Sequence, residues 1–191
     1  MGFMRRVVSF MWQCRDSWFV LVVLGVSLSF NLYFVLGSRL FTQATPPDFV
    51  TGANVPILRG EDLKGAQVEI NWGSDARPTI VYIFSPSCVW CTRNIPNIRA
   101  LDQSQSGAYR LIGISLSRDG LNKYVTDNSL QFPVYTNVRD PNGRPFAAKS
   151  TPETITVSPA GKITDVWRGA YDSRLQKRIE SKWGVHLPGL T

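Results

Sequence analysis

The chain has 191 residues, of which 43% are hydrophobic and 18% charged, enough to bury the core of one domain beside a separate apolar segment. Its net charge of +7 comes from basic residues scattered along the sequence, without a dense Lys/Arg cluster, so we expect no nucleic-acid partner. Three cysteines are too few for a disulfide scaffold, and the single histidine, His186, excludes metal sites built from several imidazoles.

The first predicted element is a transmembrane helix over residues 17–38. This stretch carries no charge, is dominated by Val, Leu and Phe, and exceeds the roughly 20 apolar residues that a helix needs to cross a bilayer. Three arginines precede it and only Arg39 follows closely, so the positive-inside rule predicts a short cytoplasmic N-terminus, residues 1–16. A cleaved signal peptide is the alternative, although its apolar core is usually shorter and a small-x-small cleavage site usually follows.

The third cysteine is separated from the other two by this helix. Cys14 precedes the predicted span, so it should lie on the opposite side of the membrane from Cys88 and Cys91 and cannot pair with them. After the span, residues 39–46 are expected to form a tether, because the stretch runs into a proline pair that disfavours a helix. The remaining residues, 47–191, are expected to form one domain.

The first half of this domain predicts alternating strands and helices. Residues 79–84 are nearly all apolar, β-branched or aromatic, as in a strand buried on both faces of a sheet. A turn and a helix with an apolar face over residues 88–101 follow, then a second strand over 109–115 and a helix over 121–128. This order predicts a βαβ unit with parallel strands.

The second half predicts an antiparallel hairpin and a final helix. Strands over residues 154–157 and 162–167 flank the turn Ser158-Pro159-Ala160-Gly161, in which proline and glycine occupy favoured turn positions. Asp172 could then cap an amphipathic helix that Gly184 ends. Its apolar residues recur every four positions: Leu175, Ile179 and Trp183.

The chemistry of the chain is predicted to reside in Cys88-Val89-Trp90-Cys91. The motif lies where a strand gives way to a helix, so Cys88 should sit among the free N–H groups at the helix start, which favour a thiolate. A thiolate is the nucleophile of disulfide exchange, and Cys91, one turn further on, could resolve the mixed disulfide. Cys88 is therefore the candidate nucleophile and Cys91 the candidate resolving cysteine.

Other readings of the cysteine pair were weighed. Half of a zinc site is one, but four ligands are needed and His186 alone cannot complete the set, so we expect no metal. A purely structural disulfide is another, although so short a loop constrains the unfolded chain little. Chance spacing of two buried cysteines is the third.

Residues 82–96, with the sequence YIFSPSCVWCTRNIP, resemble the active-site segment of thioredoxin-like proteins, most closely the membrane-anchored TlpA/ResA type. Pro96 matches the proline that kinks the first long helix of that family, and Thr151-Pro152 matches its cis-proline dipeptide. The opening Pro46-Pro47-Asp48-Phe49 is also similar, so the likeness covers roughly residues 46–183. It implies a thioredoxin-like α/β fold, in which helices flank a central mixed β-sheet.

The resemblance also implies a function. It predicts a thiol-disulfide oxidoreductase that works without a cofactor beyond its own dithiol, with Thr151 and Pro152 beside the cysteines and the Thr151 backbone offered to an extended substrate. It implies a reductant anchored in the bacterial inner membrane, with the domain in the periplasm and electrons supplied by a membrane donor. Exported cysteines, such as those of apocytochrome c, would be the protein substrates.

Two positions depart from the family pattern. Thioredoxins commonly carry a buried acid six residues before the first cysteine, and TlpA/ResA-type proteins a glutamate three after the second, whereas this chain has Tyr82 and Asn94. An alternative is therefore a membrane-tethered binding or chaperone-like module with a slow dithiol. A peroxiredoxin-like peroxidase is less consistent, because no Pro-x-x-x-Thr-x-x-Cys arrangement surrounds Cys88. Trp90 could contact partner proteins or cover the disulfide.

Overall fold

The computed structural model describes residues 18–34, 48–104 and 107–190. The chain divides into two units, Met1–Ala44 and Thr45–Thr191, and each is described by itself. Several regions named from the sequence lie outside the described residues: the N-terminal segment 1–16 with Cys14, and the tether 39–46.

An N-terminal helix occupies residues 18–34, and its large apolar side chains are exposed. The amide of Asn31 donates to the carbonyl of Ser27 at 2.7 Å, so this polar side chain is satisfied within the helix. Within the described part of the chain, no helix has both the length and the apolar character needed to cross a bilayer. The expected span, 17–38, extends at both ends beyond the described residues.

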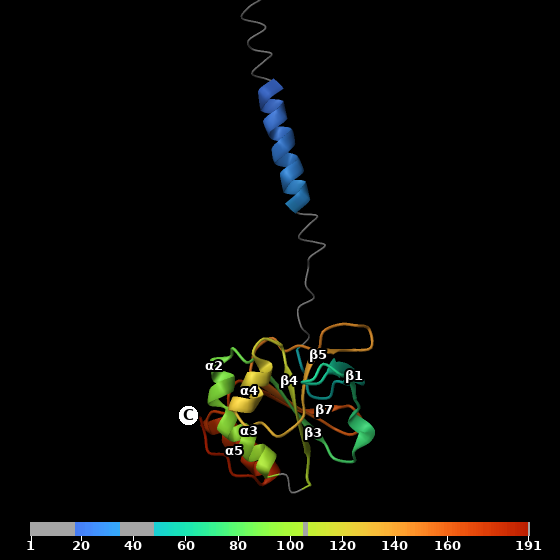
Figure 1. Cartoon of the computed structure of the whole chain (residues 1–191). Helices are drawn as coiled ribbons and strands as arrows, with labels where there is room; N and C mark the ends of the chain where they lie inside the picture. The colour runs from blue at the N-terminus through green and yellow to red at the C-terminus, as the bar shows by residue number, and fades with distance from the viewer. Residues whose placement is uncertain (1–17, 35–47, 105–106, 191) are drawn as a thin grey trace, which may run out of the picture. The chain divides into compact units, whose positions relative to one another are not determined.

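The domain is built on a mixed sheet of seven strands in the order β2-β1-β5-β4-β3-β6-β7. The strands are β1 (Leu58–Glu61), β2 (Gln67–Ile70), β3 (Thr79–Phe84), β4 (Arg110–Ser115), β5 (Val134–Arg139), β6 (Glu153–Val157) and β7 (Ile163–Arg168). A short 3₁₀ turn, η1 (Trp72–Ser74), precedes β3. Figure 1 shows the colour of the chain changing along the sheet as successive elements join it.

The pairing of the strands confirms the predicted topology. β3 and β4 are parallel and pair from Thr79↔Arg110 to Phe84↔Ser115, and β4 and β5 are parallel as well. β6 runs antiparallel to β3 and forms the expected hairpin with β7. Every residue of β3 is buried, as expected of a central strand with a continuous apolar sequence.

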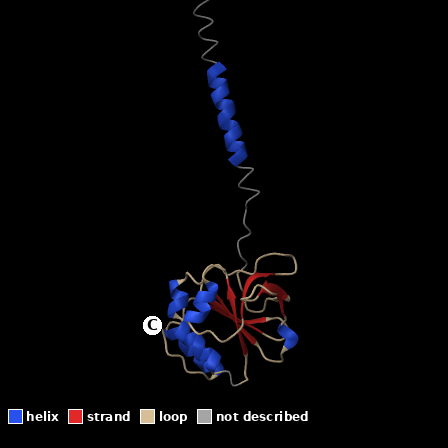
Figure 2. Ribbon diagram, viewed as in Figure 1, coloured by secondary structure: helices blue, strands red, loops and turns tan. Residues whose placement is uncertain are grey.

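Four helices pack on one face of this sheet: α2 (Val89–Arg93), α3 (Ile95–Gln103), α4 (Leu121–Asp127) and α5 (Ser173–Trp183). Their buried side chains join those of Ile80, Tyr82 and Phe84 in one core cluster, which we call the helical core. A second cluster on the other face gathers Val81 and Ile83 with residues from the start of the domain. Figure 2 shows the helices gathered beside the strands.

The helix after the cysteine motif differs from the single kinked helix that the sequence predicted. It is divided into α2 and α3 at Asn94, whose backbone N–H donates to the carbonyls of Trp90 and Cys91, each at 3.1 Å. Pro96 lies in the first turn of α3, where its missing N–H does no harm but where it could not continue α2. The proline therefore sets a helix boundary at this point.

The last helix has the predicted ends. The Asp172 side chain accepts hydrogen bonds from the backbone N–H groups of Arg174 and Leu175, at 3.1 and 2.8 Å. Gly184 closes the helix in the left-handed conformation, with a φ of 64° that glycine adopts without steric cost.

Candidate active site

Cys88 lies at the start of α2, directly after the turn that ends β3. Its backbone N–H donates to the carbonyl of Ser85 at 3.1 Å, and its own carbonyl accepts from the N–H of Thr92 at 3.1 Å. As the N-cap residue, Cys88 also receives the backbone N–H of Cys91 on its Sγ at 3.1 Å. A hydrogen-bond donor aimed at sulfur stabilises the thiolate form of that sulfur. The predicted place of Cys88 at a helix start is confirmed.

Cys88 and Cys91 form a disulfide across a Cα–Cα distance of 5.2 Å, within the normal range for such bonds. The two sulfurs differ in access. Cys91 has no exposed surface and belongs to the helical core, whereas Cys88 is only partly buried and packs at its edge. An incoming thiol or disulfide can therefore reach Cys88 far more easily than Cys91.

The Thr151-Pro152 loop lies against this disulfide. The peptide bond between the two residues is cis, as the family resemblance implied. The Sγ of Cys88 lies 3.4 Å from the carbonyl oxygen of Thr151, although 63 residues separate them in sequence. Pro152 is buried and Thr151 is half-buried. The fold thus brings together four of the five residues that the sequence analysis selected.

Trp90, the fifth, lies at the surface beside Cys88. Its side chain is 53% exposed and Val89 is 69% exposed, so two large apolar side chains flank the accessible sulfur. The guanidinium of Arg93 lies 4.8 Å from the centre of the Trp90 ring, a cation–π contact. Leu116, 39% exposed, follows the end of β4, where its N–H donates to the carbonyl of Phe84 at 2.9 Å.

Beneath Cys91, polar groups form a neutral cluster, which we call the Asn94 cluster: Tyr82, Asn94, Asn97, Thr154 and Tyr171. The Tyr82 hydroxyl donates to the carbonyl of Cys91 at 3.3 Å. The side-chain oxygen of Asn94 accepts from the backbone N–H of Tyr171 and from the amide of Asn97, both at 3.0 Å. The hydroxyls of Tyr171 and Thr154 lie 2.9 Å apart. The sequence pointed to Tyr82 and Asn94 only as departures from a pattern.

Burial keeps the tyrosines of this cluster neutral. Loss of hydration raises the pKa of Tyr82 well above its ordinary value and that of Tyr171 as well. The Asn94 amide offsets part of the effect on Tyr82, although the Nδ2 of Asn94 has no hydrogen bond of regular geometry among the described residues. None of these groups carries a charge at neutral pH.

One buried carboxylate follows the cis-proline. Glu153 is 2% exposed and its Oε1 lies 3.2 Å from the Nε of Arg168. Burial raises the pKa of Glu153, and the charge of Arg168 offsets part of that rise. In the register of β6, Glu153 pairs with Ile83, and alternate residues of a strand face opposite sides of the sheet. Its side chain therefore lies on the face away from the Asn94 cluster.

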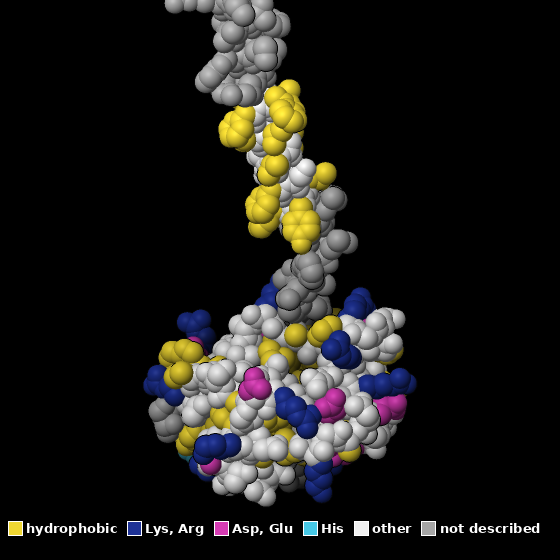
Figure 3. Space-filling model, turned by 45° about the horizontal axis from the view of Figure 1, so that its top comes forward, with side chains coloured by type: hydrophobic (Ala, Val, Ile, Leu, Met, Phe, Trp, Pro, Cys, Tyr) yellow, Lys and Arg dark blue, Asp and Glu magenta, His cyan; other side chains and the backbone are white. Residues whose placement is uncertain are grey.

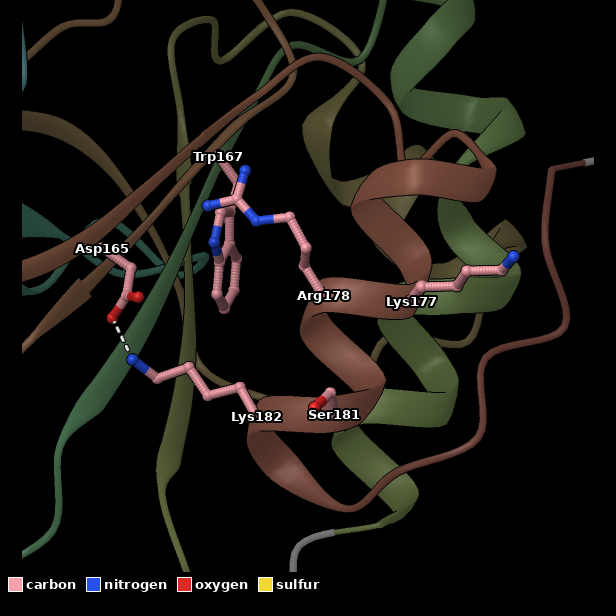
Figure 4. Close-up of a pocket in the computed structure, with 6 residues that line it drawn as sticks. All are labelled: Asp165, Trp167, Lys177, Arg178, Ser181 and Lys182. Atoms are coloured by element: carbon pink, nitrogen blue, oxygen red, sulfur yellow. Dashed lines mark hydrogen bonds and ion pairs between the residues drawn. The ribbon is translucent and has the colours of Figure 1, made fainter.

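The described residues hold no group of three or more His, Cys, Asp or Glu side chains placed to bind a metal ion. A shallow cavity of about 400 Å³ lies between β7 and α5. Figure 4 shows its lining, in which Lys182 pairs with Asp165, and none of its lining residues belongs to the cysteine site. On the face drawn in Figure 3, Lys and Arg side chains are dispersed among acidic and neutral residues.

No protein-family model matches the chain, and no curated protein matches its sequence. Solved structures do match its fold. The thioredoxin domain of a thiol-disulfide oxidoreductase from Bacteroides vulgatus is 19% identical, with a TM-score of 0.53 over 71% of this chain and 99% of that one. The chain has a thioredoxin-like fold.

Further thioredoxin-like structures agree. StoA from Bacillus subtilis is 16% identical, with a TM-score of 0.52 over 69% of this chain and 99% of that one. A thiol:disulfide interchange protein from a Bacteroides species is 20% identical, with a TM-score of 0.55 over 71% of this chain and 91% of that one. The predicted fold class, a mixed sheet with helices in the thioredoxin-like arrangement, is confirmed.

Proposed function

We propose that this protein is a thiol-disulfide oxidoreductase that exchanges electrons with protein disulfides through Cys88 and Cys91. One observation carries the proposal: an accessible and a buried cysteine form a disulfide at the start of a helix, against a cis-proline loop. A disulfide at this place joins residues only three apart, so it stabilises the fold little by restricting the unfolded chain. Redox exchange is the better explanation of its position.

The geometry assigns a role to each sulfur. In the reduced protein, the Cys88 thiolate attacks one sulfur of a substrate disulfide, and the other substrate sulfur leaves as a thiolate. Cys91 then loses its proton and attacks the Sγ of Cys88, which releases the second substrate thiolate and re-forms the Cys88–Cys91 disulfide. The exposure of Cys88 and the burial of Cys91 favour this order over the reverse.

The substrate surface follows from the same arrangement. The carbonyl of Thr151 lies beside the Cys88 sulfur, where it can accept a hydrogen bond from an extended polypeptide bound across the site. The exposed side chains of Val89 and Trp90 offer apolar contact on the other side of Cys88. We therefore propose protein cysteines in extended segments as the substrates.

We also propose that residues 17–38 anchor the protein as a single transmembrane helix, with residues 1–16 in the cytoplasm and residues 47–191 outside it. The uncharged sequence and the excess of arginine before it support this, as does the exposure of apolar side chains along residues 18–34. The setting would be a bacterial inner membrane with the domain in the periplasm. Cysteine accessibility to a membrane-impermeant maleimide would test it: Cys14 should be protected in intact cells and reduced Cys88 labelled.

With this placement, we propose a reductant that receives electrons from a membrane donor and keeps exported cysteines reduced, those of apocytochrome c among them. The direction rests on the family resemblance. Equilibration of the full chain with glutathione buffers would test it, because a reductant needs a potential well below that of the glutathione pool. A potential above that pool would indicate an oxidant.

Insulin reduction with dithiothreitol as electron source tests the activity itself. The full-length protein in detergent should reduce insulin, and Cys88→Ser should fall to the background rate. Cys14→Ser is the matched control, since it removes a thiol without touching the pair. Equal rates for the wild type and Cys88→Ser would refute the proposal.

The neutral surroundings of Cys91 favour one second candidate, a membrane-tethered binding or chaperone-like module with a slow dithiol. A Cys91→Ser variant separates the two functions, because it should retain substrates on Cys88 as mixed disulfides that mass spectrometry can identify. A binding module would instead hold the same partners after both cysteines are replaced by serine.

A further inference from the structure

The surroundings of Cys91 contain no proton acceptor that ionises near neutral pH. The titratable groups that pack into the helical core are tyrosines from several elements: Tyr82, Tyr109, Tyr124 and Tyr171. Burial raises the pKa of all four. At physiological pH each of them is a neutral hydroxyl.

Charged groups of the neighbouring elements lie outside this core. On α2, Arg93 lies over the exposed ring of Trp90, and the Glu153 side chain faces the other side of the sheet with Arg168. On α4, Lys123 and Asp127 pair with each other at the surface. The charged residues of α3 and α5 are exposed or half-buried on the outer sides of those helices: Arg99, Asp102, Arg174, Lys177, Arg178, Glu180 and Lys182.

Asn94 is the central residue of the neutral cluster. It lies three positions after Cys91, is fully buried, and joins the end of α2 to the N–H of Tyr171 and the amide of Asn97. Asn97 in turn accepts the N–H of Gly189 at 2.8 Å. The side chain thus fixes the α2–α3 junction, and with it Cys91, to the C-terminal part of the domain without introducing a charge.

Building on the proposed function, we propose that Asn94 is a positioning residue for a resolving step that has no protein base. The Asn94 cluster holds Cys91 in reach of Cys88 but offers nothing that can take its proton. Hydroxide or water must therefore remove the proton from Cys91 before its sulfur attacks the Sγ of Cys88. As a consequence, mixed disulfides with substrates persist near neutral pH and resolve faster as the pH rises.

A two-step reaction with the aromatic disulfide dithiobis(nitrobenzoate) measures this step directly. In the full chain carrying Cys14→Ser, the Cys88 thiolate attacks the reagent and releases one nitrothiobenzoate. Cys91 then attacks the mixed disulfide, closes the Cys88–Cys91 bond and releases the second. Stopped-flow absorbance resolves the two releases, so the second reports the resolving step alone.

The second release in the wild-type site should accelerate about tenfold per pH unit from about pH 6 to pH 8, while Cys91 remains mostly protonated. Asn94→Asp places a carboxylate where Asn94 Oδ1 now accepts two hydrogen bonds. It should accelerate the second release about tenfold or more at neutral pH and flatten its pH dependence. Asn122→Asp, the same change on the exposed side of α4, should alter neither.

A pH-independent second release in the wild-type site would overturn the inference, because it would reveal a base or a preformed Cys91 thiolate. So would an Asn94→Asp protein that folds and keeps the steep wild-type profile. If Asn94→Asp does not fold, the wild-type profile still decides. Absence of the first release is a different result: it would refute the proposed oxidoreductase function, since that release depends on Cys88 alone.

Discussion

Two neighbouring residue pairs on β3 and β6 show how the sheet separates chemistries. Tyr82 faces Thr154 in the register, and both contribute to the neutral Asn94 cluster beneath Cys91. One position along, Ile83 faces Glu153, whose carboxylate pairs with Arg168. Because strand side chains alternate between faces, a one-residue step moves a group from one side of the sheet to the other. A carboxylate directly after the cis-proline is thereby kept away from the resolving cysteine.

The two sides also differ in how much they depend on complete hydrogen bonding. The Asn94 cluster is fully buried, so a partner lost there leaves a polar group without water. The guanidinium of Arg168, in contrast, is 54% exposed and can be hydrated when its partner is removed. Substitutions on the two sides should therefore have unequal costs.

Asn94→Leu should have the largest effect. It leaves the N–H of Tyr171 and the amide of Asn97 without their acceptor inside the core, at a cost of about 2–4 kcal/mol in unfolding free energy. Urea unfolding of the full chain in detergent, followed by tryptophan fluorescence, measures this cost. Asn94→Asp keeps an acceptor at the same place and serves as the control; an equal loss in both variants would contradict the assigned hydrogen bonds.

Tyr171→Phe should come next, at about 1–3 kcal/mol, because it leaves the buried hydroxyl of Thr154 without its partner. Unfolding of Tyr171→Phe, Thr154→Val and the double variant forms a cycle that isolates the pair. The double variant should cost less than the sum of the two single variants. Additive costs would mean that the two hydroxyls do not interact.

Tyr82→Phe should be milder, at about 0.5–1.5 kcal/mol, because it removes one long hydrogen bond, 3.3 Å, to the Cys91 carbonyl. The pH profile of the resolving step should keep its slope, since Tyr82 supplies no base. Tyr135→Phe, at a half-buried tyrosine of β5 outside the helical core, is the control. A flattened profile in Tyr82→Phe alone would assign the tyrosine a direct role in proton transfer.

Glu153→Gln should have the smallest effect and a characteristic pH dependence. The pKa of Glu153 is higher in the folded than in the unfolded protein, so ionisation costs stability as the pH rises from the unfolded pKa through the folded one. Relative to Glu153→Gln, the wild type should be more stable below about pH 4 than at pH 7. Unfolding curves at both pH values measure this; a reversed sign would indicate that Arg168 outweighs burial.

Much of the fold could be predicted because its local signals were strong. The apolar run of β3, the Pro–Gly turn between β6 and β7, and the capped periodicity of α5 appear at the expected positions. The strands β1 and β2 were not predicted, because each has only four residues with few apolar ones. β5 does carry an alternating signal, in which Val134, Thr136 and Val138 are buried, and that pattern could have found it.

The sequence by itself determined which atoms react: the strand-to-helix junction and the cysteine spacing place two sulfurs at a helix start, since both are local properties of the chain. Only the tertiary structure decided what surrounds those sulfurs. Thr151 and Tyr171 reach the site from 63 and 77 positions away along the chain, and strand register sends Glu153 to the opposite face. Proton transfer depends on these long-range neighbours, and contacts of this kind are set by packing rather than by any local pattern.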